Sequence, residues 1–334
     1  MSETKDLPQD AVLSRRAMVG GVAAVGVAAA GPAAEAATPA GPALVDPRGK
    51  YPKPPFDKQQ QPWPGLARDM KPRPDHGEQS YKGSGRLRGR KALVTGGDSG
   101  MGRAAAIAFA REGADVAINY LPAEEADARE VIDLIRREGR KGVALPGDLR
   151  DEAFCTKLVA DAAAQLGGLD ILVNNAARQQ TKPTIGDISS EDFDATMKTN
   201  IYAPFWITKA AVPRMPPGSA IIMTTSEQAY DPSKDLVDYA MTKAANMSFA
   251  KSMAKQLADK GIRVNGVAPG PIWTPLQVSG GATQEKLQNF GGDTPLGRPG
   301  QPVELAGIYV QLAENAGSYA TGQVYGAAGG GGQP

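Results

Sequence analysis

Short apolar runs alternate with longer helical patterns along the chain from Lys91 onward. Runs rich in β-branched residues predict strands, and apolar residues that recur every three or four positions predict helices. Strands alternating with helices require right-handed crossovers, so the pattern predicts an α/β domain with one doubly wound parallel sheet and helices on both faces. We predict strands at 91–95, 115–120, 142–146, 171–174, 220–225 and 263–268, and helices at 101–112, 124–138, 152–166, 190–212, 236–260 and 303–314.

The beginning of the chain lacks this alternation. Arg15 and Arg16 precede the uncharged stretch 17–30, and the small-residue triplet Ala34-Glu35-Ala36 follows. This order is typical of a secretory signal, and the paired arginines resemble the twin-arginine type. The stretch is too short and too weakly apolar for a membrane span. We expect residues 1–36 to direct export to the periplasm or the exterior; the alternatives are an uncleaved anchor, or an alanine-rich tail on a cytoplasmic protein.

Residues 37–88 form a proline-rich extension, in which the prolines disfavour helix and interior strand. Tyr51, Phe56, Trp63 and Leu66 nevertheless give it apolar anchors that a free linker would not need. We therefore predict that the extension packs on the surface of the domain formed by residues 89–334.

Composition narrows the function mainly by exclusion. The 334 residues include 37 basic and 36 acidic side chains, a balance that suggests neither a nucleic-acid nor an anionic-membrane partner. The single histidine, His76, and the single cysteine, Cys155, exclude a multi-histidine metal site, a cysteine zinc site and an internal disulfide. We expect no bound metal, and Cys155 falls in an apolar helical pattern that predicts a small core residue.

The first predicted strand leads directly into a glycine-rich turn, Thr95-Gly96-Gly97-Asp98-Ser99-Gly100-Met101-Gly102, and then into a helix. Glycines allow a tight turn and the close approach of backbone to a pyrophosphate, while the helix N-terminus supplies free N–H groups. In the first unit of an alternating series this turn indicates a Rossmann-type dinucleotide-binding domain. The spacing T-G-x-x-x-G-x-G resembles that of the short-chain dehydrogenase/reductase family.

A second motif carries candidate chemistry. Tyr239 and Lys243 lie four residues apart in a helical pattern, so their side chains share one helix face. An ammonium near a phenol favours the phenolate and lowers the phenol pKa. Ser226 closes a predicted strand, at the end of the sheet where ligands bind, and is placed to hydrogen-bond a carbonyl or hydroxyl. The set matches the active-site pattern of the short-chain dehydrogenase/reductase family, which implies Tyr239 as acid/base, Ser226 as the group that orients the reacting oxygen, and Lys243 as ligand of the nicotinamide ribose.

The resemblance extends from Lys91 to about Gly330 and implies further site residues. Asn200 matches the asparagine that completes the family's proton relay, and Ala177 replaces the glycine of its N-N-A-G element. The turn Pro74-Asp75-His76-Gly77 and the motif at 51–56 further resemble a bacterial subgroup of general stress or aldehyde-reductase proteins with an N-terminal extension. The expected cofactor contacts are Thr95, Gly96, Asp98, Ser99, Gly100, Met101, Gly102, Asn119, Tyr120, Asp148, Leu149, Asn175, Ala176, Ala177, Lys243, Pro269, Gly270, Ile272 and Thr274.

These features predict an oxidoreductase that transfers hydride reversibly between NAD or NADP and an alcohol/carbonyl pair. The choice of cofactor stays open, because the second strand ends in Asn119-Tyr120-Leu121, which has neither the carboxylate of an NAD site nor the basic residue of an NADP site. Asp98 would oppose a 2′-phosphate if it pointed inward. A non-catalytic dinucleotide-binding sensor or scaffold is the alternative function, and a methyltransferase is disfavoured because it would leave the Ser/Tyr/Lys set unexplained.

The glycine-rich loop 273–297 has the composition of a mobile lid, and we expect Trp273 and Phe290 to line an apolar pocket for a small or medium aldehyde or ketone. The family resemblance also implies a homo-oligomer, a tetramer, assembled through the helices that carry Asn200 and Tyr239.

Overall fold

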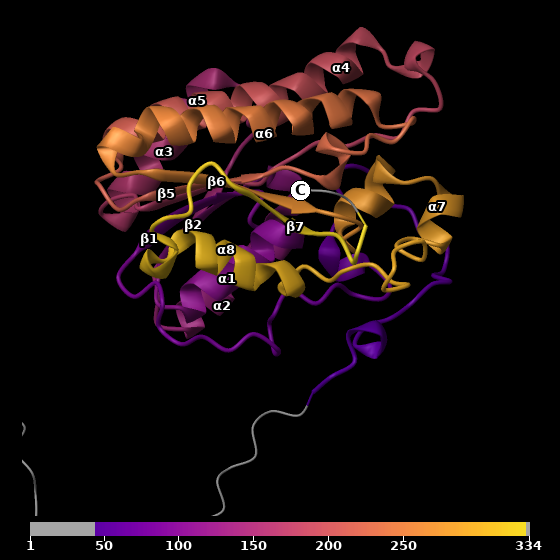
Figure 1. Cartoon of the computed structure of the whole chain (residues 1–334), viewed down its shortest axis with the longest axis horizontal. Coiled ribbons are helices and arrows are strands. Elements are labelled where there is room, and N and C mark those ends of the chain that lie inside the picture. Colours follow the sequence, from indigo (N-terminus) through magenta and orange to yellow (C-terminus); the bar gives the residue numbers. More distant parts are fainter. Residues whose placement is uncertain (1–43, 332–334) are drawn as a thin grey trace, which may run out of the picture. The chain divides into compact units, whose positions relative to one another are not determined.

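Seven strands, all parallel, form one sheet in the order β3-β2-β1-β4-β5-β6-β7 (Figure 1). The computed structural model describes residues 44–331, so the expected signal segment and residues 37–43 lie outside it. The strand order reverses direction between β1 and β4, and such a switch point opens a ligand crevice at the carboxyl ends of the strands. The predicted doubly wound Rossmann-type fold is confirmed. The strands are β1 (Lys91–Thr95), β2 (Asp115–Tyr120), β3 (Gly142–Pro146), β4 (Ile171–Asn174), β5 (Ala220–Thr224), β6 (Arg263–Pro269) and β7 (Val324–Ala327).

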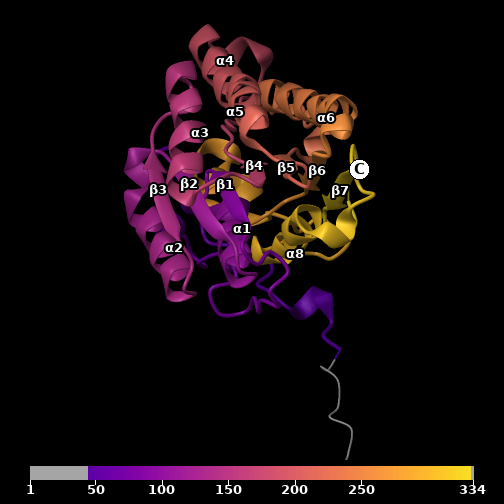
Figure 2. The same cartoon turned by 90° about the vertical axis from the view of Figure 1, so that its left-hand side faces the viewer.

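Helices cover both faces of this sheet (Figure 2). One face carries α1 (Gly100–Arg111), α2 (Glu125–Arg137) and α8 (Val303–Ala313), and the other carries α3 (Glu152–Leu166), α4 (Ser190–Met197), α5 (Ala203–Ala211) and α6 (Val237–Leu257). The sheet therefore separates two apolar cores, one on each face. A strand that is buried on both faces has no side exposed to solvent. The central strands are therefore continuous runs of apolar residues and show no alternation of apolar and polar residues.

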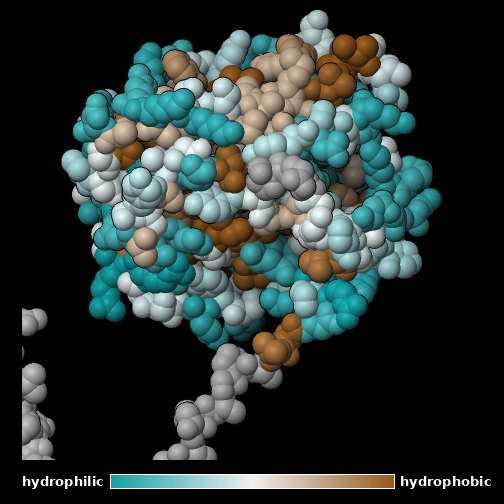
Figure 3. All heavy atoms as spheres, viewed as in Figure 1, coloured by the Kyte–Doolittle hydropathy of each residue, from teal (hydrophilic) through white to brown (hydrophobic). Residues whose placement is uncertain are grey.

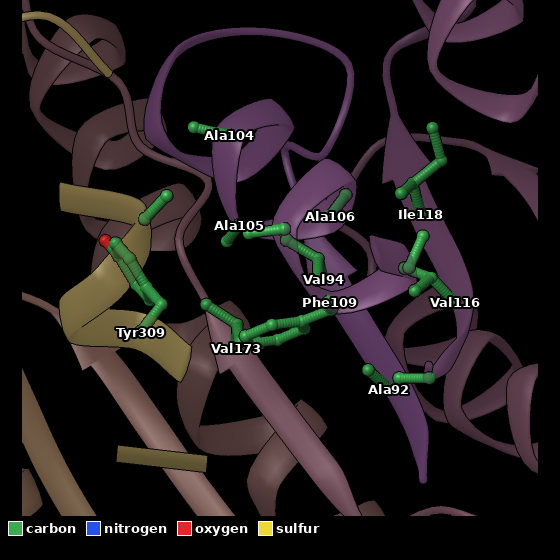
Figure 4. Close-up of a cluster of buried hydrophobic side chains, with 14 of the residues drawn as sticks. Ala92, Val94, Ala104, Ala105, Ala106, Phe109, Val116, Ile118, Val173 and Tyr309 are labelled. Atoms are coloured by element: carbon green, nitrogen blue, oxygen red, sulfur yellow. The ribbon is translucent and has the colours of Figure 1, made fainter. Parts of the chain in front are cut away.

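Small side chains set the distance between helix α1 and the sheet on the first face. The alanines of α1, with Phe109, pack onto the apolar side chains of β1 and β2, and Tyr309 of α8 closes the cluster (Figure 4). Alanine lets the helix backbone lie close to the sheet, so the N-terminus of α1 is held near the strand ends. Cys155 is buried in the core of the opposite face, as predicted.

Three elements differ from the sequence prediction. The helix expected at 190–212 is divided by a π-helical segment, Lys198–Tyr202, whose widened turn is closed by the bond from Ala203 N–H to the carbonyl of Lys198. Strand β7 lies in a glycine-rich stretch with a weak apolar signal, and the short helix α7 (Gln284–Gln288) lies in the loop expected to be irregular.

Within the unit 45–334, the extension up to residue 88 packs on the domain as predicted. Phe56 is buried and stacks on Trp273 with 4.4 Å between ring centroids, and Met70 is buried in the same cluster. In Figure 1 this indigo segment runs beside the orange loop that carries α7. His76 belongs to a structural turn, as expected: it is fully buried and its Nδ1 lies 3.1 Å from Oε1 of Glu78.

The surface carries both hydrophilic and apolar side chains. The face seen in Figure 3 is mainly hydrophilic, and apolar side chains gather along its upper edge, over α4 and α6. Within residues 44–331, no helix combines the length and the apolar character that crossing a membrane requires.

Candidate functional site

The glycine turn forms a cradle with no room for side chains. Gly96 and Gly100 have φ angles of +60° and +52°, which side-chain-bearing residues rarely adopt. A Cβ on Gly102 would lie 2.0 Å from the carbonyl oxygen of Gly96, so glycine is required for the contact between strand end and helix. Ser99 makes no side-chain cap bond to α1, which leaves the first N–H groups of this helix free to bind an anion. This open, uncapped cradle fits a pyrophosphate.

Thr95 joins the turn to the next strand end. Its Oγ1 accepts hydrogen bonds from the backbone N–H groups of Asn175 (2.9 Å) and Ala176 (3.1 Å), and it donates to the carbonyl of Val173 at 3.3 Å. Asn175 Nδ2 in turn donates to the carbonyls of Thr95 and Gly96, both at 3.1 Å. These bonds fix the floor of the cleft between β1 and β4.

Most of the expected cofactor contacts border one cleft above this floor. Thr95 and Gly102 support the cleft from behind, and Pro269, Gly270 and Ile272 line a second pocket that adjoins it. The residues that line the cleft are Gly96, Asp98, Ser99, Gly100, Met101, Asn119, Tyr120, Asp148, Leu149, Asn175, Ala176, Ala177, Lys243 and Thr274.

Tyr239 lies where the cleft and the second pocket meet, because it borders both. Ser226, at the end of β5, borders the second pocket beside it, and both side chains are buried. Lys243 lies one helical turn farther along α6, borders the cleft, and donates from Nζ to the carbonyl of Thr224 at 2.8 Å. The structure thus brings the three predicted catalytic side chains to one junction.

Burial dominates the pKa values of Tyr239 and Lys243 in this structure. Burial raises the pKa of Tyr239 to about 12, although a hydrogen bond from Ser226 acts in the opposite direction. Burial also lowers the pKa of Lys243 to about 7. Desolvation penalises the charged forms of both groups. The lowering of the tyrosine pKa by Lys243 in a cofactor-filled cleft stays a prediction.

Asn200 is tied into the protein framework. Its Oδ1 accepts from the N–H of Arg178 at 2.7 Å, and its Nδ2 donates to the carbonyl of Arg178 at 2.9 Å and to Thr242 Oγ1 at 3.0 Å. The side chain borders neither the cleft nor the second pocket. Its role in a proton relay stays a prediction, and its visible role is to hold Arg178, which lines the cleft, against the π-helical segment.

Two carboxyl groups face the part of the cleft next to the end of β2. Asp98 is almost fully buried, and its Oδ2 has no partner in the described residues. Glu124, which the sequence analysis did not single out, accepts the N–H of Leu121 on Oε2 at 2.8 Å. Burial raises the pKa of both carboxyls, and Asp98 raises that of Glu124 further. No lysine or arginine stands beside this pair in the cleft lining; Arg150 pairs with Asp148 at 2.6 Å.

The second pocket is lined by both apolar and polar side chains, so the expectation of an apolar pocket is confirmed only in part. Its volume is about 760 Å³, large enough for a substrate of several carbons. Phe290 lines it, but Trp273 is fully buried between Phe56 and Phe290 and does not. The polar and charged side chains that line it include Gln179, Thr181, Glu227, Gln228, Asp231, Ser233, Gln277, Glu285, Lys286, Asn289, Asp293 and Thr294.

Sequence reasoning also missed Trp63 and Pro64, which line the cofactor cleft from the extension. No local signal marks them, because their neighbours in the cleft lie far away in sequence. Glu227 could have been found, since it directly follows Ser226 and shares its pocket.

A dinucleotide cradle joined to a Ser/Tyr/Lys junction defines the class of nicotinamide-dependent oxidoreductases. A family model described as enoyl-(acyl carrier protein) reductase matches residues 96–331, and the chain belongs to this family of short-chain dehydrogenases/reductases.

Individual relatives agree with this assignment. The oxidoreductase YghA of Escherichia coli (strain K12) is 56% identical over 287 residues, 86% of this chain and 98% of YghA. NADPH-dependent aldehyde reductase 1, chloroplastic, of Arabidopsis thaliana is 44% identical over 267 residues, 78% of this chain and 92% of the relative. The crystal structure of a short-chain dehydrogenase from Burkholderia cenocepacia in complex with NADP matches with a TM-score of 0.69 at 32% identity, covering 73% of this chain and 98% of that one. The resemblance to family members with an N-terminal extension is confirmed, since the match to YghA is longer than the match to the family model.

Proposed function

We propose that this protein catalyses the reversible interconversion of an alcohol and a carbonyl compound, with Tyr239 as the acid/base. The observation that carries the proposal is the position of Tyr239, buried beside Ser226 where the dinucleotide cleft adjoins a second pocket. A bound nicotinamide cofactor would supply or accept the hydride.

The chain's own groups then handle the proton and the oxygen. With a pKa raised by burial to about 12, Tyr239 is protonated at neutral pH and can give its proton to a substrate oxygen that gains negative charge. Ser226 Oγ can donate a hydrogen bond to the same oxygen and stabilise that charge. For the reverse reaction the tyrosine must lose its proton. A charged Lys243 next to it favours that step, and at a pKa of about 7 it carries this charge in part of the molecules at neutral pH.

Replacing Tyr239 with phenylalanine tests the assignment. Tyr239→Phe removes the hydroxyl and keeps the ring, so we expect turnover to fall by about 10²–10⁴-fold, as for loss of a general acid. The measurement is NADH and NADPH oxidation over a panel of aldehydes and ketones, with fluorescence titration of each cofactor as the control for binding. Turnover that survives in the variant would refute the role of Tyr239, and binding of cofactor without turnover of any substrate by the wild type would favour the sensor or scaffold alternative.

For the cofactor, we propose NAD(H) over NADP(H). The support is a pair of carboxyls at the end of β2, the buried Asp98 and the half-buried Glu124, because a 2′-phosphate placed there would be repelled by either group in its ionised form. Arg103 acts on Asp98, but it pairs with Glu78 and Glu130 and does not line the cleft. The names of the Arabidopsis relative and of the Burkholderia complex speak for NADP(H) in those proteins. Glu124→Gln is therefore the informative variant: we expect NADH to bind at least tenfold more tightly than NADPH to the wild type, and the ratio to shrink in the variant. Tighter binding of NADPH by the wild type contradicts this choice.

We also propose a homo-oligomer, in which the apolar side chains exposed on the π-helical segment, α5 and α6 meet a second copy. Tyr202 and Phe205 are 47% and 50% exposed, and Met241 is 52% exposed. Light scattering of the purified protein measures the mass directly, and a monomer at micromolar concentration would contradict the proposal.

Export by a twin-arginine signal likewise stays a proposal from residues 1–36, to be tested by fractionating cells that express the full chain.

A further inference from the structure

We propose that residues 63–67 of the extension form a strap across the cofactor cleft and slow the dissociation of a bound dinucleotide. The inference rests on the proposed function in one respect, that the cleft binds a nicotinamide dinucleotide. The family model begins at residue 96, so the strap lies outside the part of the chain that the model covers.

One end of the strap is fastened to α2. The N–H of Ala67 donates to Oδ2 of Asp127 at 2.6 Å, and the N–H of Arg68 lies 3.4 Å from Oδ1 of the same carboxyl. Ala67 and Asp127 are both fully buried. Asp127 lies in the first turn of α2, one turn from Glu124, which lines the cleft at the end of β2.

The other end is fastened to the opposite side of the cleft. Ser279 Oγ lies 3.1 Å from the carbonyl oxygen of Pro64 and 2.9 Å from that of Pro275, and its single proton is shared between these two acceptors. Ser279 belongs to the turn 277–281, which follows Thr274, Pro275 and Leu276 in the cleft lining. Gly65 has a φ angle of +79°, and a Cβ there would lie 3.1 Å from Cβ of Ser279. The chain therefore lies directly on this turn, in a conformation that suits glycine.

Residues on either side of the strap hold the same loop. The N–H of Gln61 donates to the carbonyl of Val278 at 2.9 Å, Gln284 Nε2 donates to the carbonyl of Gln59 at 2.9 Å, and Trp273 Nε1 donates to the carbonyl of Pro72 at 2.8 Å. The loop that we expected to be a mobile lid is thus fixed by the extension.

Trp63 and Pro64 line the cleft at the end of the strap that contacts Ser279, and Trp63 lies between the bond of Gln61 to Val278 and that of Pro64 to Ser279. The same cleft lining includes Glu124, just before α2, and Leu276, in the loop that carries Ser279. Only Gly65 and Leu66 separate Pro64 from Ala67, which leaves the strap little slack. A dinucleotide that leaves the cleft past Trp63 must therefore wait for at least one anchor to break, which raises the barrier to dissociation.

The test is the rate at which NADH leaves the full-length protein. Protein–NADH complex is mixed with excess NAD⁺ in a stopped-flow instrument, and the loss of bound-NADH fluorescence gives the dissociation rate constant. We expect Trp63→Ala and Asp127→Asn each to raise this constant at least tenfold, and Trp63→Phe, which keeps an aromatic ring, to stay within threefold of the wild type. Gln60→Ala is the matched control, because Gln60 is an exposed neighbour in the extension for which no hydrogen bond is found. Trp63 is 39% exposed, so its truncation should leave the fold intact, which circular dichroism checks.

Dissociation rate constants within twofold of the wild type for both Trp63→Ala and Asp127→Asn would overturn the strap. So would an equal acceleration in Gln60→Ala, because the effect would then not depend on the anchors. The rate constant is measured without substrate, so failure of the proposed catalysis shows in the turnover of Tyr239→Phe, whereas failure of the strap shows only in the release of NADH.

Discussion

Thr95 offers a direct test of how the floor of the cleft is held. In Thr95→Val the side chain keeps its shape but loses the oxygen that accepts the N–H groups of Asn175 and Ala176 at 2.9 and 3.1 Å. A buried N–H left without a partner costs roughly 1–3 kcal/mol. Asn175 and Ala176 are half-buried at the edge of the cleft, where water can reach them, so we take the lower end for each. The sum predicts a loss of about 2 kcal/mol in the free energy of unfolding.

Urea denaturation of the wild type, Thr95→Val and Thr95→Ser measures this loss. Serine keeps the acceptor, so it should recover most of the difference, and NADH should bind more weakly to the valine variant because the strand ends that form the cleft are no longer joined. A valine variant within about 0.5 kcal/mol of the wild type, or a serine variant as unstable as valine, would refute the reasoning, because either result removes the role of the hydroxyl oxygen.

Three further outcomes are expected. Gly102→Ala places a methyl group 2.0 Å from a backbone oxygen and should weaken NADH binding at least a hundredfold, which titration measures. Gly307→Ala is the control: no atom lies within 4 Å of the new Cβ, so the change should be neutral or raise the free energy of unfolding by up to about 1 kcal/mol, which thermal melts check. Cys155, buried and with a pKa raised to about 12, should react with a thiol reagent only on unfolding, so rapid labelling of the native protein would contradict its place in the core. Burial and Asp231 raise the pKa of Glu227 from 4.5 to about 7, so between these pH values the folded state binds more protons than the unfolded state. The wild type should therefore lose stability relative to Glu227→Gln as the pH rises from 4.5 to 7. A difference in melting temperature between the two proteins that does not grow over this range would contradict the shift.

The fold could be predicted from the sequence because most of its strands and helices have a pattern in their own residues that indicates them. Each of β1 to β6 is a short apolar run beside a helical pattern, and the glycine turn follows β1 directly. Strand β7 was missed because Val324–Ala327 lies in a glycine-rich stretch that gives no local strand signal. This segment forms a strand because it pairs with β6.

The site could be read only in part. Ser226, Tyr239 and Lys243 follow from spacing along β5 and α6, which a sequence displays. Trp273 was misplaced because its position depends on Phe56, which is distant in the sequence. The effect of burial on the pKa of Tyr239 could not be predicted, because burial is a property of the whole fold.

The contacts of the extension also bear on the order in which the chain can fold. Pro72 and Pro64 accept hydrogen bonds from partners 201 and 215 residues later, so during synthesis this segment waits, without its docking site, for most of the protein to be made. Contacts of such long range form late and slow the search for the native state. A nascent chain would thus complete its dinucleotide site only when nearly all of it has left the ribosome, and the earliest competent species would already be a full-length molecule.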